Sequence, residues 1–290
     1  MMVSGFFSCK STKTVAQKPT KLVLQVMLIS AAFYIASSVL NESFSVKSFI
    51  RSLIPSNYFV ILYVVVYLIS PYLNILYERM NTRFIVILSL IFSGYPTVVD
   101  IFEQLTNKSW DGLSSIGLGG SHAGYTIVNF VLMYLVGMYI RKEQDKIAKL
   151  TNTRLLTIFG LSFTTIVIWS MITNTLGLST NLAWEYCNPL VIIEAGTVFI
   201  LFLRLNIGHV KWINQLSKAT FTVFLCHSYF ITHIKVEWAV QQNSFVLIMH
   251  MVISAILIYL FCYCVYLVYN SIMRIVLKKL DSKEIVITKL

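Results

Sequence analysis

The chain has 290 residues, of which 57% are hydrophobic and only 12% are charged, and its mean hydropathy is +0.75. Because soluble domains carry roughly 25% charged residues, this composition excludes an ordinary soluble protein and predicts one embedded in a membrane. The net charge of +11 would suit a nucleic-acid-binding protein, so the positions of the basic residues decide whether that class is excluded as well.

The chain starts with a short apolar stretch at residues 2–7, which is too short to cross a bilayer and reads as the end of a helix. Longer apolar segments follow, near the ~20 residues that a spanning helix needs. In chain order, the predicted spans are 21–40, 58–77, 84–102, 125–140, 155–176, 189–205, 219–235 and 245–269. They lack the alternation of barrel strands, so we predict an all-α, polytopic transmembrane helix bundle of about eight spans plus the N-terminal helix stub. Short loops predict one membrane-embedded domain over residues 1–290.

The basic residues are distributed unevenly across this predicted topology. If the N-terminus lies in the cytoplasm, most of the 23 basic residues fall on the cytoplasmic side. The opposite side holds Lys47, Arg51, Lys108 and Lys235. This bias follows the positive-inside rule, so the charge reflects orientation in a lipid bilayer and not a nucleic-acid partner. We expect a multi-pass protein of the inner or plasma membrane with both termini in the cytoplasm.

The cysteine and glycine patterns exclude two kinds of site. The five cysteines leave Cys187 alone in an outer loop, so they imply no disulfide framework, and their spacing is not that of a metal site. The stretch "DGLSSIGLGGSHAG" has His122 where a dinucleotide fingerprint needs its third glycine. We therefore expect neither a bound metal nor a dinucleotide; the stretch is either an acceptor-binding loop or a plain connector.

Three segments carry a resemblance to a known family. They are "MVSGFF" at 2–7, "NYFVILYVVVYLISPYLNIL" at 57–76 and "LSKATFTVFLCHSYFI" at 216–231. In that order they resemble three signatures of the integral-membrane acyltransferase-3 family, and the likeness runs over nearly the whole chain.

The resemblance implies an acyltransferase that has no bound cofactor and takes its acyl group, commonly acetyl, from cytoplasmic acyl-CoA. It implies a hydroxyl of a cell-surface or exported glycan as the acceptor. Members of the family carry an arginine and a histidine implicated in catalysis on a helix that precedes the segment matched by residues 2–7. The first histidine of this chain is His122. We therefore expect a chain that is N-terminally truncated relative to the family, or an inactive paralogue, and its catalytic residue is unknown.

His227 is one candidate for the catalytic base. It lies ~12 Å along its predicted span, near the middle of the bilayer. A charged residue there costs about 2.5–3.5 kcal/mol, so an ionisable side chain usually faces a polar interior. A neutral imidazole could act as a general base, or it could simply bond to another helix.

The other candidates lie toward the outer side of the membrane. Glu194 and His233 come out at the same depth, ~8 Å below the outer ends of their spans, where the carboxylate would raise the basicity of the imidazole. Asp100, His122 and Glu185 fall in the outer third or in outer loops. We expect these three to bind the acceptor, although a surface-loop histidine with no role is an alternative for His122.

On the cytoplasmic side, Arg141 and Lys142 are the candidates to bind the phosphates of acyl-CoA. Orientation in the membrane and contact with anionic lipid headgroups explain these cations without a ligand and are the favoured alternative, for Arg79 and Arg83 as well. A transporter or flippase for a lipid-linked glycan is the alternative function. That class predicts discontinuous helices or an internal repeat with a substrate site inside the membrane, and the sequence shows no repeat.

Amine labelling of intact cells tests the predicted orientation. Lys142 is placed on the cytoplasmic side, so a reagent that does not cross the membrane is expected to leave it unmodified until the cells are opened. Lys108, on the outer side, is the control that should react in intact cells. Modification of Lys142 from outside would contradict the orientation.

Overall fold

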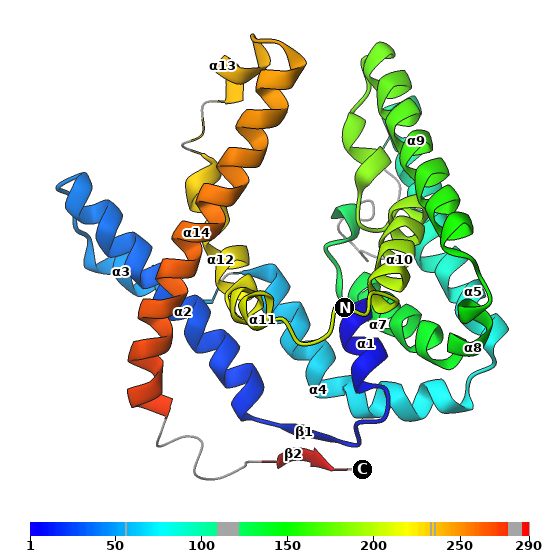
Figure 1. Ribbon diagram of the computed structural model, residues 1–290, viewed down its shortest axis with the longest axis horizontal. Helices are drawn as coiled ribbons and strands as arrows, with labels where there is room; N and C mark the ends of the chain where they lie inside the picture. Colours follow the sequence, from blue (N-terminus) through cyan, green and yellow to red (C-terminus); the bar gives the residue numbers. More distant parts are fainter. Residues whose placement is uncertain (56, 109–121, 233, 235, 278–285, 290) are drawn as a thin grey trace. The chain divides into compact units, whose positions relative to one another are not determined.

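The computed structural model describes residues 1–290 apart from 56, 109–121, 233, 235, 278–285 and 290 (Figure 1). The chain forms two compact units, which are described separately. The first comprises Met1–Val15, Tyr58–Asn206 and Val286–Leu290, and the second Ala16–Asn57 and Ile207–Ile285. The family-like motif segments fall in both units, and the single domain expected from the loop lengths stays a prediction.

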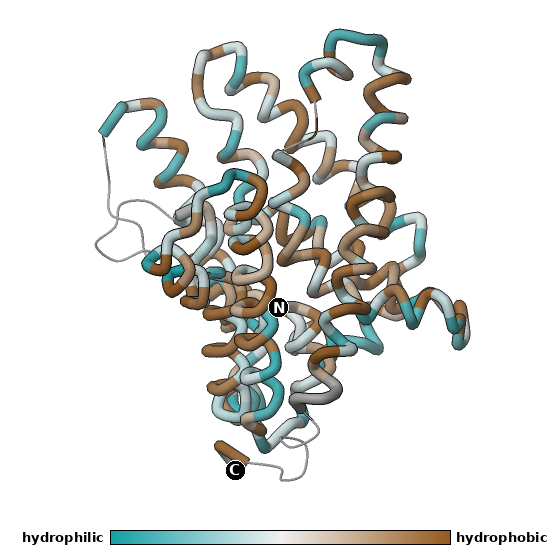
Figure 2. Tube along the Cα trace, turned by 90° about the vertical axis from the view of Figure 1, so that its left-hand side faces the viewer, coloured by the Kyte–Doolittle hydropathy of each residue, from teal (hydrophilic) through white to brown (hydrophobic). Residues whose placement is uncertain are grey.

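Six helices in the described part of the chain are long and apolar enough to cross a bilayer. They are Gln17–Leu40, Tyr58–Arg79, Thr82–Thr106, Asn152–Thr175, Thr180–Leu203 and Ser244–Met273. Figure 2 shows hydrophobic residues along the helices of both units. The predicted all-α, polytopic transmembrane bundle is confirmed.

Two of the predicted spans, 125–140 and 219–235, are not among these six helices. Helix α7 (Ile127–Lys142) has 16 residues, because Thr126 caps its N-terminus by accepting a hydrogen bond from the backbone of Asn129. Helix α12 (Thr220–Ile231) has 12 residues and begins shortly after α11 ends. The structure therefore differs from the expected number of spans: six helices meet the length criterion, and the two others lie between them in the chain.

The first unit is a helical bundle with a small two-stranded ribbon. Its elements in chain order are α1 (Met2–Ser8), β1 (Lys13–Val15), α4 (Tyr58–Arg79), α5 (Thr82–Ser89), the π-helical turn η1 (Leu90–Gly94), α6 (Tyr95–Thr106), the 3-10 turn η2 (His122–Gly124), α7, α8 (Gln144–Ala148), α9 (Asn152–Thr175), the 3-10 turn η3 (Thr180–Trp184), α10 (Pro189–Leu203) and β2 (Val286–Lys289). Strands β1 and β2 pair antiparallel, with Thr14 opposite Thr288.

The second unit contains the remaining helices. They are α2 (Gln17–Leu40), α3 (Val46–Ser52), α11 (Lys211–Ser217), α12, α13 (Val236–Val240) and α14 (Ser244–Leu277). The buried Gln25 amide on α2 donates a 2.7 Å hydrogen bond to the Thr222 hydroxyl on α12. The Phe33 ring stacks on Tyr229 with centroids 4.0 Å apart. A polar bond and an aromatic stack thus hold the two helices together.

Helices α1 and α7 cross with their backbones in contact. A Cβ added to Gly5 would lie 2.0 Å from the carbonyl oxygen of Tyr134, and one added to Gly137 would lie 2.0 Å from that of Met2. Membrane helices use such small residues because apolar lipid gives them no hydrophobic drive to associate, so close packing has to hold them together.

Asn74 joins three segments of the first unit. Its amide nitrogen donates to the carbonyl oxygens of Ser8, at 2.8 Å, and Ser11, at 2.9 Å, where α1 has ended. Its amide oxygen accepts a 3.0 Å bond from the hydroxyl of Tyr134 on α7. Asn74 is buried, so these bonds satisfy polar groups that water does not reach. Asn74, which belongs to the second motif segment, therefore bonds to the chain directly after the first.

The core of this unit lies where α4, α5 and α7 pack together. Its buried members are Val66, Tyr77, Ile85, Phe130, Tyr134, Leu135 and Met138. Aliphatic and aromatic side chains fill this core at the density typical of protein interiors, which keeps α7 fixed between its neighbours.

Alanine substitutions at two helical glycines, Gly137 and Gly160, distinguish the effect of backbone contact on stability from the effect of helix propensity. In Gly137→Ala the new methyl group meets the Met2 carbonyl, and we expect a loss of about 1–3 kcal/mol in stability and a lower Tm in detergent. Gly160→Ala on α9 is the matched control, because nothing lies within 4 Å of its Cβ position. That variant should be neutral or stabilised by up to about 1 kcal/mol. Equal melting temperatures for the two variants would contradict the crossing.

Candidate functional site

The π-helical turn η1 interrupts the helix that runs from α5 into α6. Such turns are rare and often lie at functional sites. Here the Ser93 hydroxyl, within η1, donates a short hydrogen bond to the backbone carbonyl of Cys187. Asp100 follows seven residues later, about two helical turns, so it lies on the same face as Ser93. The turn thus directs Ser93 and Asp100 toward the segment around Cys187.

Asn188 shapes that segment, which connects η3 to α10. Its amide nitrogen donates to the carbonyls of Leu182, at 3.0 Å, and Ala183, at 3.1 Å. Its amide oxygen caps the N-terminus of α10. The chain is folded back on itself between these bonds, and Glu185 and Cys187 are held in the bend.

A second turn, η2, packs directly against the same bend. Gly124 has a φ of +81°, and an added Cβ would lie 2.5 Å from the backbone nitrogen of Cys187. The backbone nitrogen of Tyr186 donates a 3.0 Å bond to the carbonyl of Ala123. The buried Asn129 amide donates to the carbonyls of Gly124, at 3.0 Å, and Tyr186, at 3.3 Å. The backbones of η2 and of the bend at Tyr186 and Cys187 are therefore in direct contact, although the two segments are far apart in the chain.

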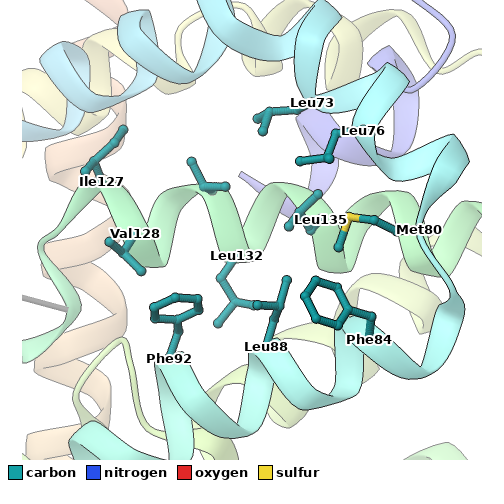
Figure 3. Close-up of a pocket in the computed structure, with 11 residues that line it drawn as sticks. Leu73, Leu76, Met80, Phe84, Leu88, Phe92, Ile127, Val128, Leu132 and Leu135 are labelled. Atoms are coloured by element: carbon teal, nitrogen blue, oxygen red, sulfur yellow. The ribbon is translucent and has the colours of Figure 1, made fainter. Parts of the chain in front are cut away.

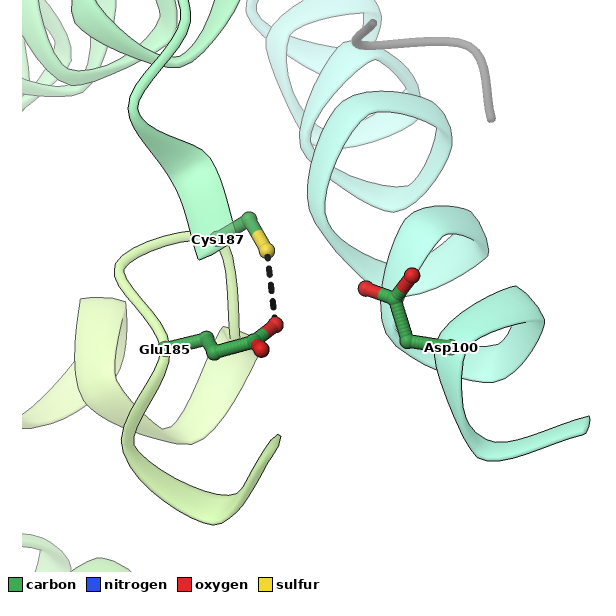
Figure 4. A group of neighbouring side chains, drawn as sticks. All are labelled: Asp100, Glu185 and Cys187. Carbon is green, nitrogen blue, oxygen red and sulfur yellow. Dashed lines mark hydrogen bonds between the residues drawn. The ribbon is translucent and has the colours of Figure 1, made fainter. Parts of the chain in front are cut away.

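Asp100, Glu185 and Cys187 converge at this junction (Figure 4). One carboxylate oxygen from each acid and the thiol sulfur all lie within 4.8 Å of one another. The Cys187 thiol faces Glu185 Oε2 at 3.9 Å. Asp100 and Cys187 are buried and Glu185 is half-buried. Carboxylate oxygens accept hydrogen bonds from hydroxyl groups, and carboxylates with a thiolate are also donors that can hold a metal ion.

Tyrosine rings border the cluster. The ring of Tyr125 packs edge-on against Tyr58, at 4.8 Å between centroids, and against Tyr186, at 5.0 Å. Burial, with smaller contributions from Tyr186 and Glu185, raises the pKa of Tyr125. Its hydroxyl therefore stays protonated and can donate a hydrogen bond at neutral pH. Aromatic walls with a few converging polar groups are typical of small-molecule sites.

The structure brings together two of the three residues expected to bind the acceptor, Asp100 and Glu185. His122 begins the η2 turn, whose backbone contacts this junction, while its side chain lies outside the described residues. Cys187 joins this cluster, although the sequence predicts it only as an isolated cysteine in an outer loop. The sequence signal for its place in the cluster is its position two residues after Glu185. The roles assigned to these residues stay predictions, as does the absence of a metal.

The structure describes two of the three candidate catalytic residues, His227 and Glu194, and they belong to different units. His227 Nδ1 donates to the carbonyls of Phe224, at 2.7 Å, and Val223, at 3.1 Å. The imidazole therefore bonds to its own helix, not to another one, and its proton lies on Nδ1. Glu194 is half-buried on α10, and His233 lies outside the described residues. The pair of Glu194 and His233 stays a prediction.

The two predicted donor-binding cations lie at the C-terminal end of α7. The Arg141 guanidinium is 5.0 Å from the centroid of the Phe6 ring, and Lys142 Nζ is 5.3 Å from that of Tyr77. Both cations are exposed, and the aromatic faces hold them in place. The η2 turn precedes the opposite end of α7, ~24 Å away along a 16-residue helix.

Comparison with known proteins gives one match. The sequence model of a family described as an acyltransferase domain, acyltransferase-3, matches residues 1–267. No curated protein and no solved structure matches the chain. The matched range contains the cluster of Asp100, Glu185 and Cys187 and the basic end of α7.

Two glycines with positive φ test how closely η2 packs on the bend. Gly124→Ala and Gly177→Ala both place alanine in a left-handed conformation, at φ of +81° and +68°, which costs roughly 1–2 kcal/mol. The new methyl group meets Cys187 only at position 124, since nothing lies within 4 Å of Gly177.

We therefore expect Gly124→Ala to lose more stability than Gly177→Ala and to expose Cys187. Alkylation at Cys187, followed by mass spectrometry in detergent, should rise in Gly124→Ala alone. If Cys187 is alkylated no more in either variant than in the unchanged protein, the close approach of η2 to the bend at Cys187 is wrong.

Proposed function

Because the chain belongs to the acyltransferase-3 family and forms a bundle of membrane-spanning helices, we propose that it transfers an acetyl group from cytoplasmic acetyl-CoA to a hydroxyl of a cell-surface or exported glycan. The carboxylate cluster of Asp100 and Glu185 is the observation that carries the choice of acceptor. The family match alone supports an acyltransferase in general.

The chemistry of the cluster suits an acceptor rich in hydroxyl groups. Two carboxylates from separate segments offer several acceptor oxygens within a few ångströms, and a sugar presents neighbouring hydroxyl groups that donate to them. Hydrogen bonds to charged groups are about twice as strong as neutral ones, so this pair can orient a glycan. The tyrosine hydroxyl of Tyr125 adds a donor, and its ring adds an apolar face.

The donor is proposed to bind at the other end of α7. The phosphates of acetyl-CoA would contact Arg141 and Lys142, which are exposed and held over aromatic rings. Cations at one end of the helix and carboxylates beyond the other match a donor and an acceptor that arrive from opposite sides of the membrane. The orientation of the termini in the cytoplasm belongs to this proposal.

Transfer exchanges one ester for another. The acceptor hydroxyl oxygen bonds to the acetyl carbon, the thioester C–S bond breaks, and the hydroxyl proton passes to a base and then to the sulfur of CoA. Among the predicted bases, His227 donates through Nδ1 to its own helix, which leaves Nε2 as the nitrogen that accepts a proton. Asp100 and Glu185 would position the acceptor and not take part in bond breaking.

A transfer assay tests the acceptor site. The protein is reconstituted in liposomes with labelled acetyl-CoA and isolated envelope glycan, and acetyl incorporation is measured. Asp100→Asn and Glu185→Gln each remove a charged hydrogen-bond acceptor, which is worth about 1.5–3 kcal/mol, so kcat/KM for the glycan should fall about ten- to hundredfold. The KM for acetyl-CoA should not change.

Glu78→Gln, at an exposed carboxylate on α4, is the matched control and should retain full activity. An unchanged glycan KM in both cluster variants would remove the acceptor site from the proposal. Failure of the unchanged protein to acetylate any envelope glycan would contradict the proposed function itself.

A further inference from the structure

An apolar groove runs between α4, the α5–η1 segment and α7 (Figure 3). Its volume is about 360 Å³. Its lining consists of leucine, isoleucine, valine, methionine and phenylalanine side chains: Leu73, Leu76, Met80, Phe84, Leu88, Phe92, Ile127, Val128, Val131, Leu132 and Leu135. The groove is distinct from the Asp100 cluster and contains no group that could do acyl-transfer chemistry.

The groove has a buried side and a partly exposed side. Leu132 and Leu135 are buried and form its floor, while Leu76 and Phe84 are about half exposed on its walls. One wall extends from Phe84 to Phe92, ~12 Å at 1.5 Å per residue. One leaflet of the hydrocarbon core is ~15 Å thick, half of the ~30 Å total. The groove therefore has about the length that one leaflet supplies.

One end of the groove is marked by cations. Met80 and Phe84 line this end of the groove. Arg79 directly precedes Met80 in the chain, and Arg83 directly precedes Phe84, so both arginines adjoin it. Both arginine side chains are exposed. They belong to the end of the bundle that also carries Lys142, at the C-terminus of α7. Neither arginine has a role in the proposed transfer reaction.

Two carboxylates belong to this end, Glu78, which directly precedes Arg79 and is exposed, and Glu143, which is already engaged. Glu143 forms a 2.7 Å ion pair with Lys146 and accepts a bond from Thr82 at the start of α5. The hydrogen bond from Lys146 lowers the pKa of Glu143, so the carboxyl group stays ionised and paired. With Glu143 paired to Lys146, the three cations Arg79, Arg83 and Lys142 outnumber Glu78, so this end of the groove keeps a net positive charge.

We propose that the groove binds one acyl chain of an anionic phospholipid, with the lipid phosphate held by Arg79 and Arg83. An unfilled groove would forfeit dispersion contacts along its lining, and the surrounding bilayer supplies chains that restore them. Basic pockets between membrane helices are known to bind anionic headgroups, and here the cations and the hydrocarbon surface adjoin. The bound acyl chain would pack against both α4 and α5 and so stabilise the bundle that carries the acceptor site.

Native mass spectrometry with defined lipids tests the proposal. The full chain is purified in detergent and supplied with phosphatidylglycerol or phosphatidylcholine of the same acyl chains. Phosphatidylglycerol is expected to be retained more strongly and to raise the Tm more, because only its headgroup carries net negative charge. Each arginine is expected to contribute about fivefold to this preference.

Two variants separate the headgroup from the chain. Arg79→Gln combined with Arg83→Gln should abolish the preference for phosphatidylglycerol and leave weak retention of both lipids. Val131→Phe fills the groove and should reduce the retention of both lipids. Arg154→Gln, at an exposed arginine on α9, is the matched control and should behave as the unchanged protein.

Equal retention of the two lipids by the unchanged protein would overturn the proposal. So would an unaltered preference in the double arginine variant, whose exposed substitutions leave the packing intact and keep the test valid if Val131→Phe does not fold. The acetyl-transfer assay is independent, so loss of lipid preference with full activity would still leave the proposed function in place.

Discussion

The hydrocarbon of a bilayer offers no hydrogen bonds, so every backbone group inside it has to be satisfied by the protein. Helices meet this constraint along their length, and the structure is helical nearly throughout the described residues. Where the backbone departs from a helix, polar side chains supply the missing partners. Asn74 bonds to the carbonyls after α1, Asn129 to those of the η2 turn and the neighbouring bend, and Asn188 to those before α10.

The candidate acceptor site depends on the same asparagines. Asp100 sits on a helix, but Glu185 and Cys187 sit in a bend that has no regular structure of its own. Asn188 bonds within the bend, and Asn129 ties it to the η2 turn. Polar groups in the interior are therefore both the structural solution to the bilayer and the scaffold on which the titratable side chains are held.

Much of the fold follows from the sequence because the underlying rule is simple. Long apolar runs have one stable form in lipid, so the all-α character and the places of most spanning helices could be predicted. Depth is also additive at 1.5 Å per residue, which is why Asp100 and Glu185 could be placed toward the same face of the membrane. Their actual meeting depends on the η1 turn and on Gly124, and neither feature leaves a periodic pattern in the sequence.

Other features depend on tertiary packing and were not accessible from the sequence. The lengths of α7 and α12 are set by where the chain turns, and hydropathy does not record turns inside an apolar run. For His227 the sequence left open a general base or a bond to another helix, and the rotamer that selects the carbonyl of Phe224 on its own helix follows from its surroundings. The groove exists because Leu132 and Leu135 are set back between two helices whose crossing no local pattern encodes.

The pairing of β1 with β2 limits how many times the chain between them can cross the membrane. Its strands come from residues 13–15 and 286–289, and such a pair forms only if both strands lie in the same aqueous compartment. The polypeptide between them must therefore traverse the bilayer an even number of times. If each of the six long helices crosses once, they satisfy this condition, and the two short helices, α7 and α12, are then coupled: either both traverse the membrane or neither does.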